Sequence, residues 1–341
     1  MERKIIQKHL GKSFAGLLAG GAFFFVLTAC SGDDSLLCND GGTDVPASGE
    51  LVLVTMEAML ENGSMTRATK VTTLSKGSIG VFRTAPVSDN FPQLYNVQYT
   101  NDGSGWKVAD AKKTIWLDSK DATLHAYYPY GKVTFDASEP TQTTLTVKDY
   151  TADDDLCYAN APTAVVNDKN PKASFLLKHA YARLKFSITR NSNYPTACKI
   201  TKFVMEPVNQ GNKFYTTCVI DISKPVGEGV QLGGETAAWT PELTSLAMYT
   251  AGIAKDAENT EIDKLFPPQP FATGSGGTKL TLTIDEQLYT VTIPLDAFAA
   301  LRAGYESTVK LEVQGNGIEV LGVNIHQWVD DSIGNEDSFL D

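Results

Sequence analysis

The sequence predicts an all-β protein built from two antiparallel β-sandwich domains in tandem. Short segments in which every second residue is apolar recur along the chain, and turn residues separate them, as in half-buried strands. Helical periodicity is scarce, and the segment from Leu295 to Leu301 is the best candidate for a short helix. A chain of 341 residues is too long for one small domain, so two sandwiches are expected.

The expected strands follow one another over most of the chain, and no tandem repeat of fixed period accompanies them. A break is expected near Asn167 to Lys178, where Asp168-Lys169-Asn170-Pro171-Lys172 has the composition of a loop. It separates an expected N-terminal domain at residues 50–175 from an expected C-terminal domain at residues 176–341. The strands are expected at Leu51–Met56, Ser78–Phe82, Thr114–Leu117, Ala122–Tyr128, Thr144–Val147, Ala182–Ile188, Lys199–Met205, Phe214–Ile220, Leu280–Ile284, Leu288–Ile293, Thr308–Val313 and Ile318–Trp328.

The composition excludes two classes of protein. Apolar residues make up 42% of the chain and aromatic residues 9%, so the chain can bury a core and is not a disordered polymer. A formal net charge of −11 leaves no basic surface that could meet phosphate groups. Nucleic acid is therefore not an expected partner.

The N-terminal segment has the features of a secretory signal peptide at residues 1–29. Its start is basic, and the apolar run from Phe14 to Ala29 is shorter than the roughly 20 residues of a membrane span. The segment ends in Leu27-Thr28-Ala29-Cys30, which resembles the lipobox of bacterial lipoproteins. In those proteins the chain is cut before the cysteine, here between Ala29 and Cys30, and the thiol is lipidated, as with palmitate. The alternative is an ordinary signal peptide with a chance cysteine.

Residues 30–49 are expected to form a lipidated flexible tether, because they are rich in Asp, Gly, Ser and Asn. The tether begins with the acidic run Ser31-Gly32-Asp33-Asp34. This run resembles the signal that sends Bacteroidetes lipoproteins to the outer face of the outer membrane. A solvated linker without that role is the alternative.

Four cysteines besides Cys30 could form two disulfides in an exported chain, with three possible connectivities. Cys198 and Cys218 lie in expected strands that could pair, whereas Cys38 lies in the tether and Cys157 lies farther along the chain. Their spacings relative to one another and to the histidines match no metal pattern. Buried thiols without disulfides are the slightly preferred interpretation.

Several segments together resemble fimbrillins, the pilin-like lipoproteins of Bacteroidetes fimbriae. No single segment is decisive, but their order and their position behind a lipobox make the resemblance fairly specific over most of the chain after Gly49. The segments are Ile79-Gly80-Val81-Phe82, Trp116, Leu124-His125-Ala126-Tyr127-Tyr128-Pro129-Tyr130, Asp155-Leu156-Cys157-Tyr158-Ala159, Phe175 to Leu184, Ala303-Gly304-Tyr305 and Val323 to Trp328.

The resemblance implies two transthyretin-like sandwich domains and a fimbrial subunit that serves cell adhesion. It also implies maturation, in which a trypsin-like protease cuts after an arginine and the subunits then assemble by strand exchange. The matching position is the bond between Arg67 and Ala68, which makes residues 50–67 a possible propeptide strand. The implied partners are other fimbrial subunits, the protease at Arg67 and the outer membrane through the lipid on Cys30. An unremarkable exposed Arg67 in a loop is the alternative.

The residues themselves give this maturation a physical basis. Glu50 to Leu60 alternates, so it can form a first strand with an apolar face on the sandwich core. If that strand left, the groove would expose apolar side chains and unpaired backbone groups to water. A strand from a neighbouring subunit could fill the groove by β-augmentation.

The C-terminal segment departs from the fimbrillin pattern. Residues 329–341 contain five acids, a glycine and few β-branched residues, which makes them a poor donor strand. The chain could therefore accept a strand without donating one, as a tip or accessory subunit would. It could also remain an uncut surface lipoprotein.

Catalysis is not expected, and neither is a cofactor or a metal ion. His125, His179 and His326 lie in or beside expected strands without catalytic or metal spacing, so core or strand-edge positions are expected. A monomeric surface lipoprotein that binds glycans is the competing function. Tyr127, Tyr128 and Tyr130 are its candidate sugar platform, although strand alternation places Tyr127 and Tyr128 on opposite faces.

Overall fold

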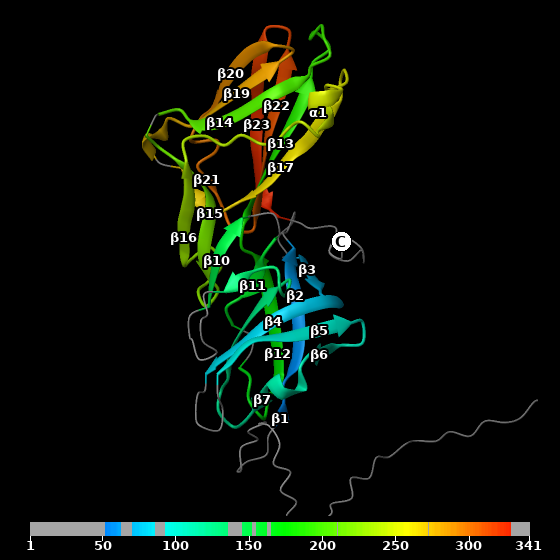
Figure 1. Cartoon of the computed structure of the whole chain (residues 1–341), viewed down its shortest axis with the longest axis vertical. Coiled ribbons are helices and arrows are strands. Elements are labelled where there is room, and N and C mark those ends of the chain that lie inside the picture. The colour runs from blue at the N-terminus through cyan, green and yellow to red at the C-terminus, as the bar shows by residue number, and fades with distance from the viewer. Residues whose placement is uncertain are drawn as a thin grey trace, which may run out of the picture. The chain divides into compact units, whose positions relative to one another are not determined.

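Figure 1 shows a computed structural model of the chain. The structure describes residues 52–62, 70–85, 93–135, 145–151, 155–161, 165–209, 211–271 and 273–328. The regular structure of these residues is almost entirely β, which confirms the all-β prediction. In this part of the chain, no helix has both the length and the apolar character needed to cross a membrane.

The largest sheet has eight strands and is formed by residues between Thr55 and His179 (Figure 1). Its strands are antiparallel to their neighbours except for β2 and β12, which run parallel. In spatial order the strands are β3 (Lys70–Thr73), β2 (Thr55–Asn62), β12 (Lys172–His179), β11 (Cys157–Ala159), β8 (Thr123–Tyr128), β4 (Lys76–Ala85), β5 (Leu94–Asp102) and β6 (Trp106–Val108).

A four-stranded sheet joins distant parts of the sequence. Its spatial order is β16 (Val230–Thr236), β15 (Phe214–Asp221), β10 (Thr146–Thr151) and β9 (Thr134–Phe135). β15 of the hairpin formed with β16 thus pairs with β10, which precedes it by more than sixty residues. Two short elements accompany these sheets: β1 (Val52–Leu53) pairs with β7 (Trp116–Leu117), and the 3-10 turn η1 is Ala111–Lys113.

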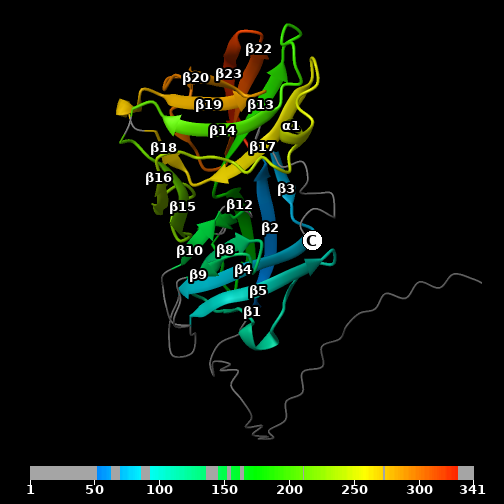
Figure 2. The same ribbon diagram turned by 45° about the horizontal axis from the view of Figure 1, so that its top comes forward.

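The remaining strands form a second group. One sheet has the order β17 (Glu258–Phe266), β13 (Ala182–Arg190), β22 (Tyr305–Gln314) and β23 (Gly317–Gln327), and Figure 2 shows a second sheet lying across it. The second sheet contains β14 (Ile200–Pro207), β19 (Thr278–Ile284) and β20 (Gln287–Ile293). A small pair is formed by β18 (Gln269–Pro270) and β21 (Ala300–Leu301), and the one-turn elements are α1 (Ala247–Thr250) and η2 (Thr273–Ser275).

Both faces of the eight-stranded sheet are buried around three of its strands, β4, β8 and β11. Successive strand residues point to opposite faces, so Val81 and Tyr128 belong to one apolar cluster, while Phe82 and Tyr127 belong to another. The second cluster also contains Cys218 from β15, so the four-stranded sheet covers that face. A third cluster fills the space between the two sheets of the second group and includes Phe186, Phe203, Leu282 and Leu311.

One local expectation is wrong, and another is confirmed. Leu295 to Leu301 forms a turn followed by β21 rather than a helix, because Phe298 and Leu301 are both drawn into the core between sheets. The loop expected at Asp168 to Lys172 is confirmed as a turn that precedes β12, whose alternating buried residues begin at Ala173. The division expected at residues 175 and 176 falls inside this strand.

Candidate functional site

The first long strand, β2, has the apolar face that its alternation predicts. Val54, which precedes it, and Ala58 and Leu60 within it are almost fully buried in one core cluster, and Met56 packs against that cluster. Burying one large apolar side chain contributes roughly 1.5–3 kcal/mol. The side chains of β2 are therefore part of the core rather than a cover over it.

The backbone of β2 is paired along both edges. On one side it runs parallel to β12, from Thr55 opposite Lys172 to Leu60 opposite Leu177. On the other side it pairs antiparallel with β3, and the register includes Met59 opposite Thr73. Among the described residues, β3 has β2 as its one neighbour in the sheet. Departure of β2 would therefore leave the hydrogen-bonding groups on these edges of β12 and β3 without their present partners.

Two acidic side chains on the outward face of β2 form ion pairs with lysines of β12. The Glu57 carboxylate lies 2.6 Å from Lys172 Nζ and accepts a 3.1 Å hydrogen bond from Ser174 Oγ. The hydrogen bond from Lys172, followed by the one from Ser174, lowers the pKa of Glu57 below its ordinary value. Four residues further along β2, the Glu61 carboxylate lies 2.8 Å from Lys178 Nζ. Glu57 and Glu61 on β2 thus each pair with a lysine on β12. Both ion pairs lie along the seam, which is the boundary where β2 and β12 pair.

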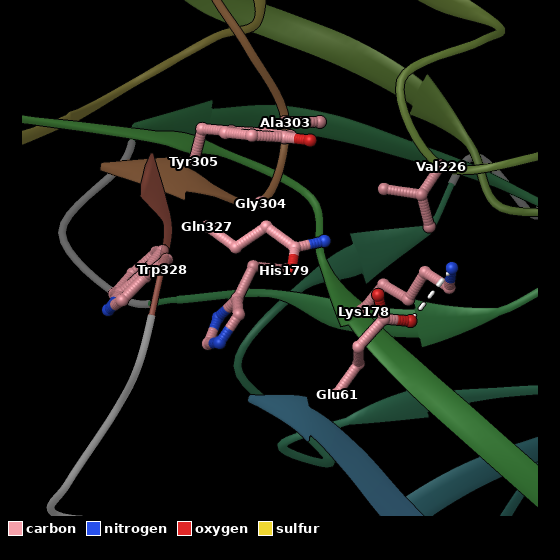
Figure 3. Close-up of a pocket in the computed structure, with 9 residues that line it drawn as sticks. All are labelled: Glu61, Lys178, His179, Val226, Ala303, Gly304, Tyr305, Gln327 and Trp328. Atoms are coloured by element: carbon pink, nitrogen blue, oxygen red, sulfur yellow. Dashed lines mark ion pairs between the residues drawn. The ribbon is translucent and has the colours of Figure 1, made fainter. Parts of the chain in front are cut away.

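A cavity of about 220 Å³ lies where this seam ends (Figure 3). The Glu61–Lys178 ion pair forms one side, and residues at the start of β22 and the end of β23 form the other. The residues that line it are Glu61, Lys178, His179, Val226, Ala303, Gly304, Tyr305, Gln327 and Trp328.

His179 at the end of β12 is the centre of a buried polar cluster that the sequence analysis missed. Its Nδ1 lies 2.5 Å from Asp155 Oδ2 and 3.4 Å from Cys157 Sγ. Its ring stacks on Trp328 at 4.1 Å between centroids, and the Arg183 guanidinium lies over the same indole. A search along the sequence for closely spaced ligands could not find this cluster, because His179 meets Cys157 as its cross-strand neighbour.

The cluster lacks the geometry of a thiol protease site. In such a site the carboxylate and the nucleophile contact opposite nitrogens of the histidine, so that a proton can pass between them. Here Asp155 and Cys157 both meet Nδ1 of His179. The arrangement fits a structural or ligand-holding role better than nucleophilic catalysis.

The other two histidines occupy the kinds of position expected. His125 is buried in β8 and contacts Thr84 Oγ1 through Nε2, and burial lowers the pKa of His125. His326 is exposed on β23, which forms one edge of its sheet. Its Nε2 lies 3.7 Å from Glu306.

The candidate sugar platform does not lie on the surface. Tyr127 is fully buried and Tyr128 is 7% exposed, and they belong to clusters on opposite faces of the sheet, as the alternation predicts. Tyr130 is half-buried and stacks on Tyr127. These three side chains therefore offer no flat exposed surface to a sugar ring.

The remaining predicted site residues, Ala29, Cys30, Arg67 and Ala68, lie outside the described residues. Arg67 belongs to the connection between β2, which ends at Asn62, and β3, which begins at Lys70. Cys157, Cys198 and Cys218 are buried and outside any disulfide. Cys198 precedes β14 rather than lying in a strand, and β14 belongs to a different sheet from β15, which holds Cys218, so the possible pairing of their strands does not occur.

Comparison with known proteins identifies the family. The fimbrillin-like family profile matches residues 66–328. Candidate cell adhesion proteins of Bacteroides uniformis and Bacteroides ovatus share the fold, each with a TM-score of 0.53. They are 17% and 15% identical to this chain and cover 81% and 82% of it, over 99% of their own lengths. No curated protein matches the chain. Because the family profile spans most of the sequence, the chain belongs to the fimbrillin-like family.

Proposed function

We propose that this protein is a fimbrial subunit that reaches the outer membrane as a lipoprotein on Cys30 and joins the fimbrium by exchange of strand β2. Membership of the fimbrillin-like family and the fold shared with candidate cell adhesion proteins support a subunit of a cell-surface fimbrium. The observation that carries the strand-exchange step is the seating of β2, which is paired on both edges and buried along one face.

Cleavage after Arg67 would change how β2 is held in its seat, which is the place between β3 and β12 that it occupies in the sheet. It would leave β1 and β2 attached to the body by non-covalent contacts alone, whereas β3 and everything after it would stay in one chain. Loss of β2 would expose the apolar groove that Val54, Ala58 and Leu60 fill. An exposed groove bordered by unpaired strands is a strong acceptor for another strand.

The seat also defines the donor that would fit. One face of the donor should carry small or medium apolar side chains, because Ala58 and Leu60 are completely enclosed. The other face should carry two acids four residues apart, to replace Glu57 and Glu61 opposite Lys172 and Lys178. Each exposed ion pair contributes only about 0.2–1 kcal/mol, so the acids set the register, and the apolar face supplies most of the affinity.

The acidic segment at residues 329–341 matches this donor poorly, because it lacks regular apolar alternation. The chain is therefore proposed to accept a strand without donating this segment, as a tip or accessory subunit would. In the purified protein its donor would be another segment of a second copy, and in the fimbrium a different subunit would supply the strand.

Proteolysis tests the proposal directly. An arginine-specific trypsin-like protease should cut the purified precursor after Arg67 and convert monomers into oligomers, as followed by mass spectrometry and size-exclusion chromatography. Arg67→Ala should block both changes. Arg302→Ala is the matched control, since Arg302 is exposed between β21 and β22, and this variant should assemble normally. Oligomers formed by uncut Arg67→Ala protein would refute protease-triggered exchange.

A further inference from the structure

The Asp155, Cys157 and His179 cluster brings three different metal-binding side chains into one buried place. Cys157 Sγ lies 3.2 Å from Asp155 Oδ2 and 3.4 Å from His179 Nδ1, and the carboxylate and imidazole atoms lie 2.5 Å apart. The Cys157 residue is 1% exposed and His179 is 2% exposed. The side chain of Asp155 is 11% exposed, so the carboxylate forms the outer rim of the cluster.

The sheet builds this arrangement from backbone geometry. Asp155 and Cys157 are two residues apart on one extended segment, so their side chains point to the same face. His179 is the direct antiparallel partner of Cys157, which places the two side chains side by side on that face. Asp155 and Cys157, two residues apart, and His179, the cross-strand neighbour of Cys157, therefore bring their side chains together on one face of the sheet.

We propose that Asp155, Cys157 and His179 form a binding site for a divalent transition-metal ion, with Zn²⁺ as the best match. A thiolate, an imidazole and a carboxylate are the three ligand types that Zn²⁺ takes from proteins. Tetrahedral coordination at ordinary zinc bond lengths separates ligand atoms by roughly 3.3–3.6 Å. Both distances from Cys157 are close to this range, and the contact between Asp155 and His179 would need to open by about 1 Å.

A second observation concerns the carboxylate. Asp155 Oδ2 takes both short contacts within the cluster, whereas Asp155 Oδ1 is buried without a hydrogen-bond partner among the described residues. An unsatisfied buried oxygen is costly. A metal ion would engage it, because a bidentate carboxylate supplies two oxygens and brings the ligand atoms from this chain to four.

The ion would connect elements that the sheet alone joins weakly. β11 is only three residues long, and His179 stacks on Trp328 at the end of β23. A metal held by Asp155 just before β11, Cys157 in β11 and His179 in β12 would fix the His179 ring against Trp328. The inference does not depend on strand exchange, because every ligand belongs to the chain that remains after a cut at Arg67.

Cobalt spectroscopy tests the site in the full chain. After dialysis against a chelator, Co²⁺ titration should give a sulfur-to-cobalt charge-transfer band that saturates at one ion per chain, and Zn²⁺ should abolish it by displacement. Cys157→Ser should remove the band and weaken Zn²⁺ binding, measured by calorimetry, by about tenfold or more. Asp155→Asn should weaken binding while leaving the sulfur band, which provides a second variant if Cys157→Ser does not fold.

The matched controls are Cys218→Ser, which removes a buried thiol from a different cluster, and Cys38→Ser. Both variants should keep the band and the Zn²⁺ affinity of the unmodified chain. Absence of a saturable band in the unmodified chain would overturn the proposal. Retention of the band and of full Zn²⁺ affinity in Cys157→Ser would overturn it as well.

Discussion

Gly80 occupies a place in β4 that no larger residue fits. It lies directly opposite Tyr127 in the sheet, and a Cβ added to it would overlap the Tyr127 ring and lie 2.7 Å from Asn96 Oδ1. The Tyr127 hydroxyl donates a 2.9 Å hydrogen bond to the same oxygen, so the ring cannot move away without losing it. The Ile79-Gly80-Val81-Phe82 segment that carried part of the family resemblance thus has a packing reason for its glycine.

We therefore predict that Gly80→Ala lowers the free energy of unfolding by about 1–3 kcal/mol through overpacking. Urea denaturation followed by tyrosine and tryptophan fluorescence measures the change. Gly317→Ala is the control, because a Cβ at Gly317 meets no atom within 4 Å, and it should change stability by no more than about 0.5 kcal/mol. Equal stability of the two variants would show that the contact with Tyr127 is not tight.

Asp285 organises the loop before β14 through four hydrogen bonds. Its carboxylate accepts from Thr196 Oγ1, from the backbone N–H groups of Cys198 and Lys199, and from the Tyr194 hydroxyl, over 2.5–3.1 Å. Burial alone would raise the pKa of Asp285, but these donors together outweigh it and lower the pKa below its ordinary value. The folded protein therefore favours the charged carboxylate.

Asp285→Asn should cost about 1–3 kcal/mol at neutral pH, because several of these hydrogen bonds lose their charged acceptor. A lowered pKa in the folded state contributes stability above the ordinary carboxyl pKa, and that contribution disappears as the pH falls through the folded value. The difference between unmodified and Asp285→Asn protein should thus shrink on acidification below about pH 4. Urea denaturation across this pH range checks the sign, and a difference that grows with acid would contradict it.

At this scale the sequence predicted some positions and could not predict others. The opposite orientation of Tyr127 and Tyr128 follows from strand alternation, and the structure confirms it. The meeting of Cys157 with His179 depends on the register between β11 and β12. That register is set by contacts along the whole sheet, and no local spacing reveals it.

Among the elements, β2 is the one on which the proposed assembly depends. Leu60 is fully buried near its end, so Leu60→Ala should destabilise the protein by about 2–5 kcal/mol. The loss should concentrate in β2 and β3, whose amide hydrogens should exchange faster than those of β13 and β22. Hydrogen exchange with mass spectrometry resolves these segments.

Leu288→Ala is the matched control for this prediction, because it makes the same chemical change at a leucine that is 67% exposed on β20. It should leave exchange in β2 and overall stability nearly unchanged. Uniform acceleration over all strands in Leu60→Ala would instead mean that β2 unfolds only together with the whole chain.

Strand alternation predicted most of the strands, and its failures have physical causes. β12 was not among the expected strands because Lys172, Ser174 and Lys178 interrupt its apolar residues, although they belong to the face that meets Glu57 and Glu61. In the expected helix at Leu295 to Leu301, Phe298 and Leu301 are buried by tertiary contacts around a turn and β21. Tertiary packing overrides such short local patterns.

In the whole molecule, the hairpin of β15 and β16 completes a sheet with β9 and β10 from the first half of the chain. Sequence order alone suggested two separate consecutive domains, since nothing local marks a pairing between segments so far apart. The buried side chain of Cys218 and its neighbours Tyr158 and Leu145 belong to one cluster that this pairing creates. The part of the chain after residue 176 thus contributes to the core beside the eight-stranded sheet.

Membrane attachment is a separate prediction at this scale. If Cys30 carries the lipid, Cys30→Ala should move the protein from the membrane fraction to the soluble fraction, because the anchor is covalent. Fractionation and metabolic labelling with a palmitate analogue measure this change, with Cys38→Ser as the control that should stay in the membrane. Unchanged fractionation of Cys30→Ala would refute lipid anchoring there.

The central claim is that the seat of β2 accepts an equivalent strand from outside the chain. Sedimentation of the protein cut after Arg67, with and without an excess of a synthetic peptide of residues 50–62, tests this claim most directly. We predict that the cut protein forms oligomers alone and stays monomeric with the peptide. A peptide carrying Ala58→Asp and Leu60→Asp should have little effect, because these two positions are fully enclosed and a buried unpaired charge is costly. Cut protein that stays monomeric without peptide, or that assembles equally with either peptide, would contradict the account.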